Sequence, residues 1–321
     1  MVSDRQTRQA VIGVDVGGTK MAGAVVDEEG NILYRNTIAS HGNQKPFNRL
    51  VSLIKDLAEW IKHTNGDVVA IGVGLGVPGV VHNDGDTVSV CPGLGWEQLA
   101  IRRLVQKQVG LPVWLDNDLN VITLGEIWRG SLKNVDHGIC VAIGTGLGAG
   151  IEIKGEIYRG ANGASGEIGL WALLGSQEGQ KSSAGDLESY VAGPGILRRA
   201  IDCGFTCGDS TYLTAEDVFE AAVHGDETAR RIVQETTTIL GRAIANMALL
   251  LDVQKIVFTG GVSQVGEELL VPVRNMVNEL VPFAPEIVPS TLGLDAGILG
   301  AVYGFLKSYQ GITNINRGGV V

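Results

Sequence analysis

The fold is decided by residues 11–20, VIGVDVGGTK, near the start of a chain of 321 residues. Residues 11–16 form an apolar, β-branched run with one acid, Asp15, near its end, which is typical of a buried strand. The glycines that follow indicate a tight turn, and the apolar run 22–26 predicts a returning strand. A third run begins at Ile32, so the stretch predicts a meander of strands whose first turn is rich in glycine.

This first turn carries groups that suit a phosphate. Gly17 and Gly18 have no side chains, so backbone N–H groups can approach an anion closely, and Thr19 and Lys20 add a hydroxyl group and a positive charge. A carboxylate at the end of a buried strand, such as that of Asp15, is costly unless something uses it. We interpret the stretch as a phosphate-holding hairpin whose carboxylate faces a hydrated metal ion. For one such stretch alone, an ordinary glycine hairpin is the alternative.

The same design occurs a second time, in residues 139–153, ICVAIGTGLGAGIEI. An apolar strand enters a turn made by Gly144, Thr145 and Gly146, a second strand leaves it, and a third run covers 156–158. Two copies of one meander predict two similar α/β domains that face each other across a central cleft. We expect the first domain to contain residues 1–118, joined by a last helix in 294–321, and the second to contain 119–293.

Composition restricts the class of protein. With 25 Lys and Arg against 35 Asp and Glu, the formal net charge is −10, a field that repels nucleic acid and anionic membranes. The first nine residues contain no apolar core of a signal peptide, and the run 68–81 is interrupted by glycine and proline, so we expect a cytoplasmic protein. The four cysteines are expected to be reduced thiols, because Cys203 and Cys207 have no second Cys/His pair with matching spacing.

A cluster of polar residues marks the candidate catalytic position. The strand 111–115 runs into Asp116, Asn117 and Asp118, and a helix is expected over 119–128. A helix N-terminus keeps a carboxylate ionised, as a general base requires, which favours Asp118. The alternative is that Asp118 merely caps the helix. The sequence predicts further helices over 47–64, 97–109, 187–201, 227–251, 267–281 and 295–309, and another that opens at Thr214. The helix over 187–201 is expected to be interrupted at residues 193–195, Gly-Pro-Gly.

Two acids and a glycine pair complete the set of candidates. Glu167 lies in a glycine-rich loop and Glu188 at the start of a helix, and carboxylates that converge on one site suit a ligand with several hydroxyl groups. For Glu188 alone, a favourable charge in the first helical turn is the alternative. Gly260 and Gly261 follow an apolar strand and allow a ligand to approach the backbone closely.

These motifs together resemble the ROK family (repressors, open reading frames and sugar kinases) of the actin-like ATPase superfamily, over nearly the whole chain. The resemblance implies two actin-like (ribonuclease H-like) α/β domains and ATP-dependent phosphorylation of a hexose, most often glucose at its 6-hydroxyl. It implies that Asp118 accepts the hydroxyl proton, and that the sugar is held by Gly79, Asn117, Asp118, Glu167 and Glu188. It also implies that ATP and Mg²⁺ are bound near Asp15, Gly17, Gly18, Thr19, Lys20, Gly144, Thr145, Gly146, Gly260 and Gly261.

The sequence departs from the family pattern at three places. Leu170 stands where many members have a histidine that contacts sugar and zinc, residues 175–186 contain none of the usual zinc-loop cysteines, and Gly93 replaces an asparagine. We therefore expect no structural zinc and a sugar pocket that lacks one polar contact, which leaves strict glucose specificity open.

Several alternatives to glucokinase activity follow from these departures. The alternative substrates are mannose, fructose, allose or an N-acetylhexosamine, and polyphosphate is an alternative phosphate donor. A repressor is disfavoured because only fourteen residues precede Asp15. A sugar-binding protein without catalysis is disfavoured because Asp118 and both glycine turns are present. The resemblance also implies a homodimer or homotetramer.

Overall fold

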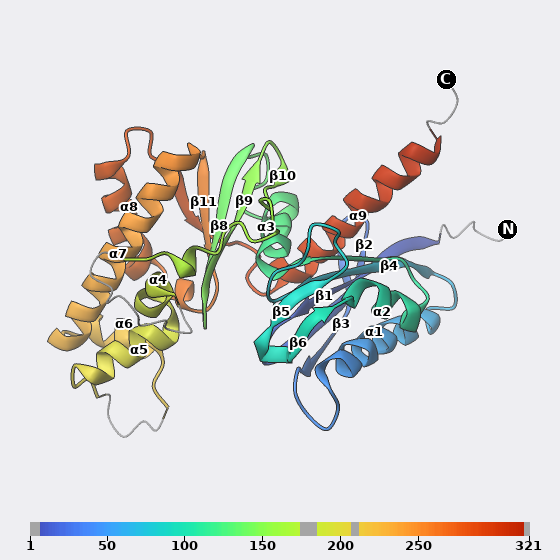
Figure 1. The fold of residues 1–321 in the computed structure, drawn as a ribbon, viewed down its shortest axis with the longest axis horizontal. Helices are drawn as coiled ribbons and strands as arrows, with labels where there is room; N and C mark the ends of the chain where they lie inside the picture. Colours follow the sequence, from blue (N-terminus) through green and yellow to red (C-terminus); the bar gives the residue numbers. More distant parts are fainter. Residues whose placement is uncertain (1–6, 174–184, 207–211, 318–321) are drawn as a thin grey trace. The chain divides into compact units, whose positions relative to one another are not determined.

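A computed structural model describes residues 7–173, 185–206 and 212–317 of the chain. The chain divides into two compact units, which Figure 1 shows in sequence colours. Unit 1 is drawn from Met1–Lys133, Arg159–Ala164 and Leu294–Val321, and unit 2 from Asn134–Tyr158 and Ser165–Gly293.

Unit 1 is built on a five-stranded sheet with the strand order β3-β2-β1-β4-β7. The meander predicted from the first glycine turn forms its antiparallel part, and two parallel strands extend it on the other side of β1. The strands of this sheet are β1 (Arg8–Val16), β2 (Lys20–Asp27), β3 (Ile32–Ala39), β4 (Val68–Val77) and β7 (Val113–Asn117). A separate antiparallel pair is formed by β5 (Val88–Cys91) and β6 (Trp96–Leu99).

Helices cover both faces of this sheet. On one face lie α1 (Pro46–Lys62) and α2 (Ile101–Val109), and on the other lie α3 (Asp118–Arg129) and α9 (Asp295–Arg317), as Figure 1 shows. Helix α1 follows from its apolar spacing, since it buries Leu50, Val51, Leu53, Ile54, Leu57 and Ile61. The prediction of a helix over 97–109 is wrong at its start, because residues 96–99 pair with β5 and the helix begins only at Ile101.

Close packing of α9 against α3 sets the limits of unit 1. A Cβ atom at Gly300 would collide with the carbonyl oxygen of Val121, and one at Gly125 would collide with that of Ala296, so the glycines let the two backbones approach. Because α3 packs on α9 in this way, it belongs to unit 1. The compact units thus differ from the division expected at residue 118, and they also place residues 159–164 in unit 1.

Unit 2 repeats the same sheet design. Its strand order is β10-β9-β8-β11-β12, again with an antiparallel meander on one side and parallel strands on the other. The strands are β8 (His137–Ile143), β9 (Leu147–Ile153), β10 (Glu156–Ile157), β11 (Lys255–Thr259) and β12 (Glu286–Pro289). The prediction of two α/β domains that each begin with a glycine-turn meander is confirmed.

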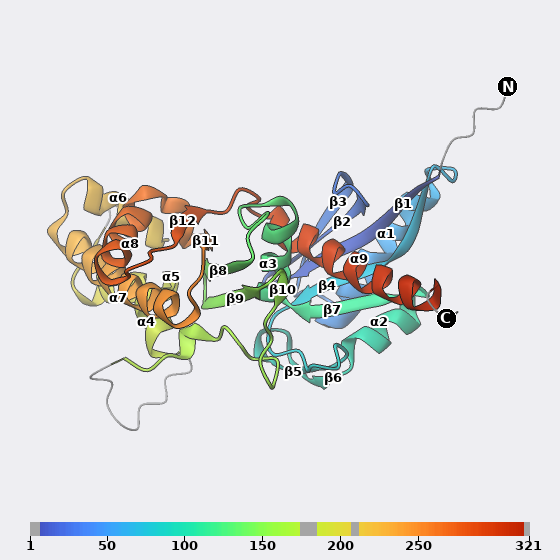
Figure 2. The same cartoon turned by 90° about the horizontal axis from the view of Figure 1, so that it is seen from above.

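Helices of unit 2 gather on one side of its sheet, as Figure 2 shows. They are α4 (Asp186–Val191), α5 (Gly193–Asp202), α6 (Ala215–Val223), α7 (Glu227–Leu251) and α8 (Glu267–Leu280). Short 3-10 helices are η1 (Pro92–Leu94) in unit 1, and η2 (Ile168–Leu170) and η3 (Val262–Val265) in unit 2. No helix in the described part of the chain is both long and apolar enough to span a bilayer.

Candidate active site

The first glycine turn is held in place by a residue that the sequence did not single out. Ser40, fully buried, donates from its backbone N–H to the carbonyl of Thr19 (2.8 Å) and from its hydroxyl to the carbonyl of Gly17 (2.6 Å). The N–H of Gly17 donates to the carbonyl of Lys20 (2.9 Å), which closes the turn. Gly18, Thr19 and Lys20 are exposed, so their polar groups can bind a ligand.

Asp15 lies at the end of β1, where its strand neighbours are Ala22 and Gly76. A Cβ atom at Gly297, on α9, would lie only 2.7 Å from the carboxyl carbon of Asp15, so α9 packs directly on this side chain. Burial raises the pKa of Asp15 to about 6, although the positive charge of Lys20 acts in the opposite direction. A half-buried carboxylate with a raised pKa gains from a nearby cation, so Asp15 fits a role beside a phosphate-bound Mg²⁺.

Helix α3 begins with the Asn117–Asp118 pair. The side-chain oxygen of Asn117 accepts hydrogen bonds from the backbone N–H groups of Leu119 (2.9 Å) and Asn120 (3.3 Å), which makes Asn117 the N-cap. Asp118 is the first helical residue, and its carboxylate accepts from the N–H of Leu119 (2.9 Å). The alternative that Asp118 is itself the cap is therefore wrong, and its half-buried carboxylate lies where the helix N-terminus favours the ionised form.

Gly79 lies beside this helix N-terminus. The side-chain N–H of Asn117 donates to the carbonyl of Gly79 (2.9 Å), so the structure brings these two predicted sugar-binding residues together. Gly79 has a positive φ of 90°, and a Cβ atom there would collide with the carbonyl of Val90. Only glycine fits this position, and it fixes the backbone against which Asn117 is held.

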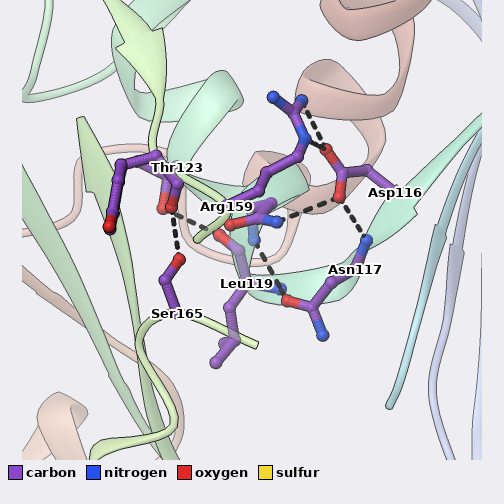
Figure 3. A network of polar contacts seen from close by, with 8 residues as sticks. Asp116, Asn117, Leu119, Thr123, Arg159 and Ser165 are labelled. Carbon is purple, nitrogen blue, oxygen red and sulfur yellow. Dashed lines mark hydrogen bonds and ion pairs between the residues drawn. The ribbon is translucent and has the colours of Figure 1, made fainter. Parts of the chain in front are cut away.

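Asp116 and Arg159 form the third part of the unit 1 site, which Figure 3 shows. One carboxylate oxygen of Asp116 accepts from Nε (2.9 Å) and Nη2 (2.6 Å) of Arg159. The other accepts from the backbone N–H of Asn117 (2.8 Å) and from the side-chain amide of Asn120 (2.9 Å). Arg159 was not predicted from the sequence, because 43 residues separate it from Asp116 and no local pattern marks it.

In unit 2 the second glycine turn is tied to a predicted sugar-binding acid. The N–H of Gly144 donates to the carbonyl of Gly146 (2.9 Å), and the N–H of Gly193 donates to the carbonyl of Gly144 (2.9 Å). A carboxylate oxygen of Glu188 accepts from the backbone N–H of Leu147 (3.0 Å), directly after the turn. Glu188 therefore supports the turn as well as being a candidate for hydroxyl groups, while Thr145 is exposed at its tip.

Glu167 and Glu188 lie close enough to influence each other. Burial, followed by the negative charge of Glu188, raises the pKa of Glu167 above its ordinary value. Gly166, with a positive φ of 85°, sets the start of this segment, since a Cβ atom there would collide with the carbonyl of Ala149. Leu170 is 66% exposed. Most of the loop to which the zinc prediction applies, 174–184, lies outside the described residues, so that prediction stays a prediction.

Gly260 and Gly261 lie beside the second glycine turn. Gly260 has a positive φ of 91°, and a Cβ atom there would collide with the carbonyl of Ile143. Gly261 is the N-cap of η3, a helix that forms one wall of a pocket of about 460 Å³. Side chains from α6, η3 and the start of α8 line this pocket: Glu216, Phe219, Glu220, Val223, His224, Gln264, Val265 and Glu268. The glycine pair predicted that a ligand can approach the backbone here, but the residues that line the pocket belong to no sequence motif and were not predicted.

The structure thus arranges the predicted site residues in two sets, one in each unit. A family model described as the ROK family matches residues 11–307. The chain belongs to the ROK family. Similar ROK proteins include a glucokinase of Halalkalibacterium halodurans, which is 33% identical over 319 residues, covering 93% of this chain and 95% of the relative.

Two further relatives show the functional range of this ROK protein's neighbours. The crystal structure of a ROK family glucokinase from Streptomyces griseus in complex with glucose and AMPPNP is 30% identical, with a TM-score of 0.76, over 91% of this chain and 98% of that one. A putative xylose repressor of a Caldicellulosiruptor species is 29% identical, covering 83% of this chain and 69% of the relative. The relatives thus include both a glucokinase and a putative repressor, so similarity alone does not distinguish these two functions, and the residues of the site have to be considered.

Proposed function

We propose that this protein is an ATP-dependent sugar kinase that phosphorylates a hexose, with glucose at its 6-hydroxyl as the favoured substrate. The observation that supports this most is the position of Asp118, in the first turn of α3 beside the Asn117–Gly79 contact. Asn117 provides the helix cap, so the carboxylate of Asp118 is not required for that task. A general base needs a carboxylate that is fixed in place next to the sugar.

In the proposed reaction the sugar hydroxyl oxygen attacks the γ-phosphorus of ATP. A new oxygen–phosphorus bond forms, the bond to the β-phosphate oxygen breaks, and ADP leaves, while Asp118 takes the hydroxyl proton. Backbone N–H groups of the two glycine turns orient the phosphates, and Lys20 and Thr19 add a charge and a hydroxyl group. Mg²⁺, when bound with ATP beside Asp15, supplies charge neutralisation for the phosphates.

The phosphate donor is proposed to be ATP because a pocket adjoins Gly261 in unit 2. Its volume of about 460 Å³ suits a nucleoside, and Phe219, Val223 and Val265 provide apolar walls for a base. The similar glucokinase from Streptomyces griseus was crystallised with AMPPNP, an ATP analogue. Polyphosphate, the alternative donor, has no base and gains nothing from such a pocket.

The identity of the sugar is the least constrained part of the proposal. Glu167 and Glu188 provide acceptors for hydroxyl protons, but Leu170 provides no hydrogen bond in place of the family histidine. Mannose, fructose, allose or an N-acetylhexosamine are therefore the alternatives to glucose. A sugar-binding regulatory protein is a further alternative, since xylose repressors are among the relatives. The proposed location is the cytoplasm, and the proposed assembly is a homodimer or homotetramer.

The proposal is tested by following ADP release with Mg-ATP and a panel of hexoses and N-acetylhexosamines. We expect sugar-dependent turnover in the wild type and its loss, by about 10²-fold or more, in Asp118→Asn. Asp226→Asn is the matched control, because Asp226 also lies at a helix N-terminus and accepts from the N–H of Ala229 (2.7 Å), but at α7. Turnover that survives in Asp118→Asn, or no turnover with any sugar, would refute the proposal.

A further inference from the structure

We propose that Arg159 is a positioning residue for the catalytic pair Asn117–Asp118, acting through the buried carboxylate of Asp116; this inference rests on the proposed kinase function. Asp116 is 4% exposed and immediately precedes the pair. Arg159 donates from two N–H groups of its planar fork, Nε and Nη2, to one and the same carboxylate oxygen of Asp116, and such charge-assisted hydrogen bonds are stronger than neutral ones. A lysine has no such planar fork.

Asp116 accepts hydrogen bonds from residues that precede and follow Asp118 in the sequence. Its first oxygen accepts from the backbone N–H of Asn117, one residue before Asp118, and from the side chain of Asn120, two residues after it. The orientation of Asp116 therefore fixes the turn between β7 and α3 from which Asp118 projects. Arg159 binds the second oxygen, so the arginine determines how the whole carboxylate group is turned (Figure 3).

Arg159 belongs to a short segment, residues 159–164, whose backbone is held in place by other parts of unit 1. The chain enters unit 1 at Arg159 and leaves it after Ala164. Within unit 1, the side chain of Asn83 donates to the carbonyls of Gly160 (3.3 Å) and Ala161 (2.8 Å). Gly163 has a positive φ of 72°, and a Cβ atom there would collide with the carbonyl of Val81. Arg159 is thus presented to Asp116 from a fixed backbone.

The residues that flank this segment, Tyr158 and Ser165, belong to unit 2, and the chain continues from Ser165 into the loop that contains Glu167. The hydroxyl of Ser165 donates to the carbonyl of Tyr158, which closes the segment at its base. Glu167 follows two residues after Ser165. The stretch of chain that presents Glu167 to the sugar therefore also carries the arginine that orients the base.

The carboxylate of this ion pair is buried, with 5% of the Asp116 side chain exposed, whereas the Arg159 side chain is 39% exposed. Removing Arg159 leaves the buried carboxylate of Asp116 without its cation, and a buried charge that loses its partner reorganises its surroundings or takes up a proton. Either response weakens the bonds to Asn117 and Asn120. A displacement of about 1 Å at a reacting group costs on the order of 100-fold in rate. The expected effect is therefore on turnover and not on nucleotide binding.

The test compares kcat and KM in Arg159→Met, Arg159→Lys and Asp116→Asn with a matched control, Arg274→Met. Arg274 also pairs with an acid, Glu267 (2.6 Å), and donates to the carbonyl of Ile287 (2.8 Å), but lies in α8. We expect kcat to fall on the order of 10- to 100-fold in Arg159→Met with the KM for ATP changed by less than about threefold. Arg159→Lys is expected to restore part of the loss, and the control to keep the wild-type kcat.

The double variant Arg159→Met with Asp116→Asn decides whether the two residues act as one unit. We expect its kcat to be no lower than that of the worse single variant, because the second change removes the unpaired charge. Multiplicative losses, an unchanged kcat in Arg159→Met, or a rise in KM alone would overturn the inference.

The positioning role of Arg159 can be tested independently of the kinase proposal. If the wild type phosphorylates no sugar, the kinase proposal fails, and the side-chain amide NMR signals of Asn117 and Asn120 still report on the arrangement. These signals are expected to shift in Arg159→Lys, a variant that keeps the charge and therefore the fold, and to stay in place in Arg274→Met. Unshifted Asn117 and Asn120 signals in Arg159→Lys would overturn the positioning role.

Discussion

The contact between α9 and Asp15 makes a quantitative prediction for Gly297→Ala. The added methyl group would lie 2.7 Å from the carboxyl carbon, 2.8 Å from one carboxylate oxygen and 3.0 Å from the Cβ atom of Asp15. Such overpacking costs about 1–3 kcal/mol, and the gain in helix propensity from glycine to alanine returns about 1 kcal/mol. We expect a net destabilisation of about 0–2 kcal/mol.

The effect of Gly297→Ala on activity should exceed its effect on stability. Asp15 must rotate away from the methyl group, so the carboxylate proposed to accompany Mg-ATP is displaced, and kcat/KM for Mg-ATP is expected to fall by about 10- to 100-fold. Gly304→Ala is the matched control on the same helix, because its methyl group would collide with the ring of Trp114 and not with a site residue.

Urea unfolding and steady-state kinetics of both variants give the answer. The reasoning holds if both lose comparable stability and only Gly297→Ala loses activity. It is refuted if Gly297→Ala keeps wild-type kcat/KM, or if Gly304→Ala loses as much activity.

Three further predictions follow from the site. Because burial raises the pKa of Asp15 from 3.8 to about 6, its ionisation opposes folding, and the stability present at low pH is lost as the pH rises from about 4 to 6. Asp15→Asn should therefore raise the free energy of unfolding of the ligand-free protein by up to about 3 kcal/mol at pH 8 and leave it unchanged at pH 3, as measured by urea unfolding, while sugar phosphorylation is lost. A stabilisation by Asp15→Asn that is the same at both pH values would contradict this. Asn117→Ala should cost about 1–2 kcal/mol in the free energy of unfolding, since it removes both the cap of α3 and the bond to Gly79; a loss below about 0.5 kcal/mol would show that the cap is unimportant. Glu188→Gln should lower the pKa of Glu167 toward its ordinary value of 4.5 in an NMR titration, because a like charge is removed while an acceptor for the N–H of Leu147 remains; an unchanged pKa would assign the shift to burial alone.

Local patterns were sufficient for the parts of the site that lie within one turn or one helix start. The glycine turn after Asp15, its repeat at Gly144 and the polar cluster before α3 are each encoded by neighbouring residues, so their strand, turn and helix context could be predicted. The repeated meander also predicted the two-domain fold, because two copies of one strand pattern lead to two copies of one sheet.

Long-range contacts could not be predicted in this way. Ser40 supports the turn at Gly17 from 23 residues away, and Arg159 reaches Asp116 across 43 residues, yet neither lies in a distinctive pattern. The start of α2 was misplaced for a related reason, since the pairing of Trp96 with Cys91 in a two-stranded sheet overrides the helical spacing of the segment. Such contacts depend on which segments the fold brings together, and one sequence gives no local signal for them.

The central claim, phosphoryl transfer from ATP to a sugar hydroxyl, is tested most directly by ³¹P NMR of a reaction with Mg-ATP and glucose. The account predicts a new phosphomonoester signal coupled to the protons on carbon 6, growing in step with ADP and absent in Asp118→Asn. Formation of inorganic phosphate with ADP, or an ATP spectrum that stays unchanged with glucose and with every other sugar of the panel, would contradict it.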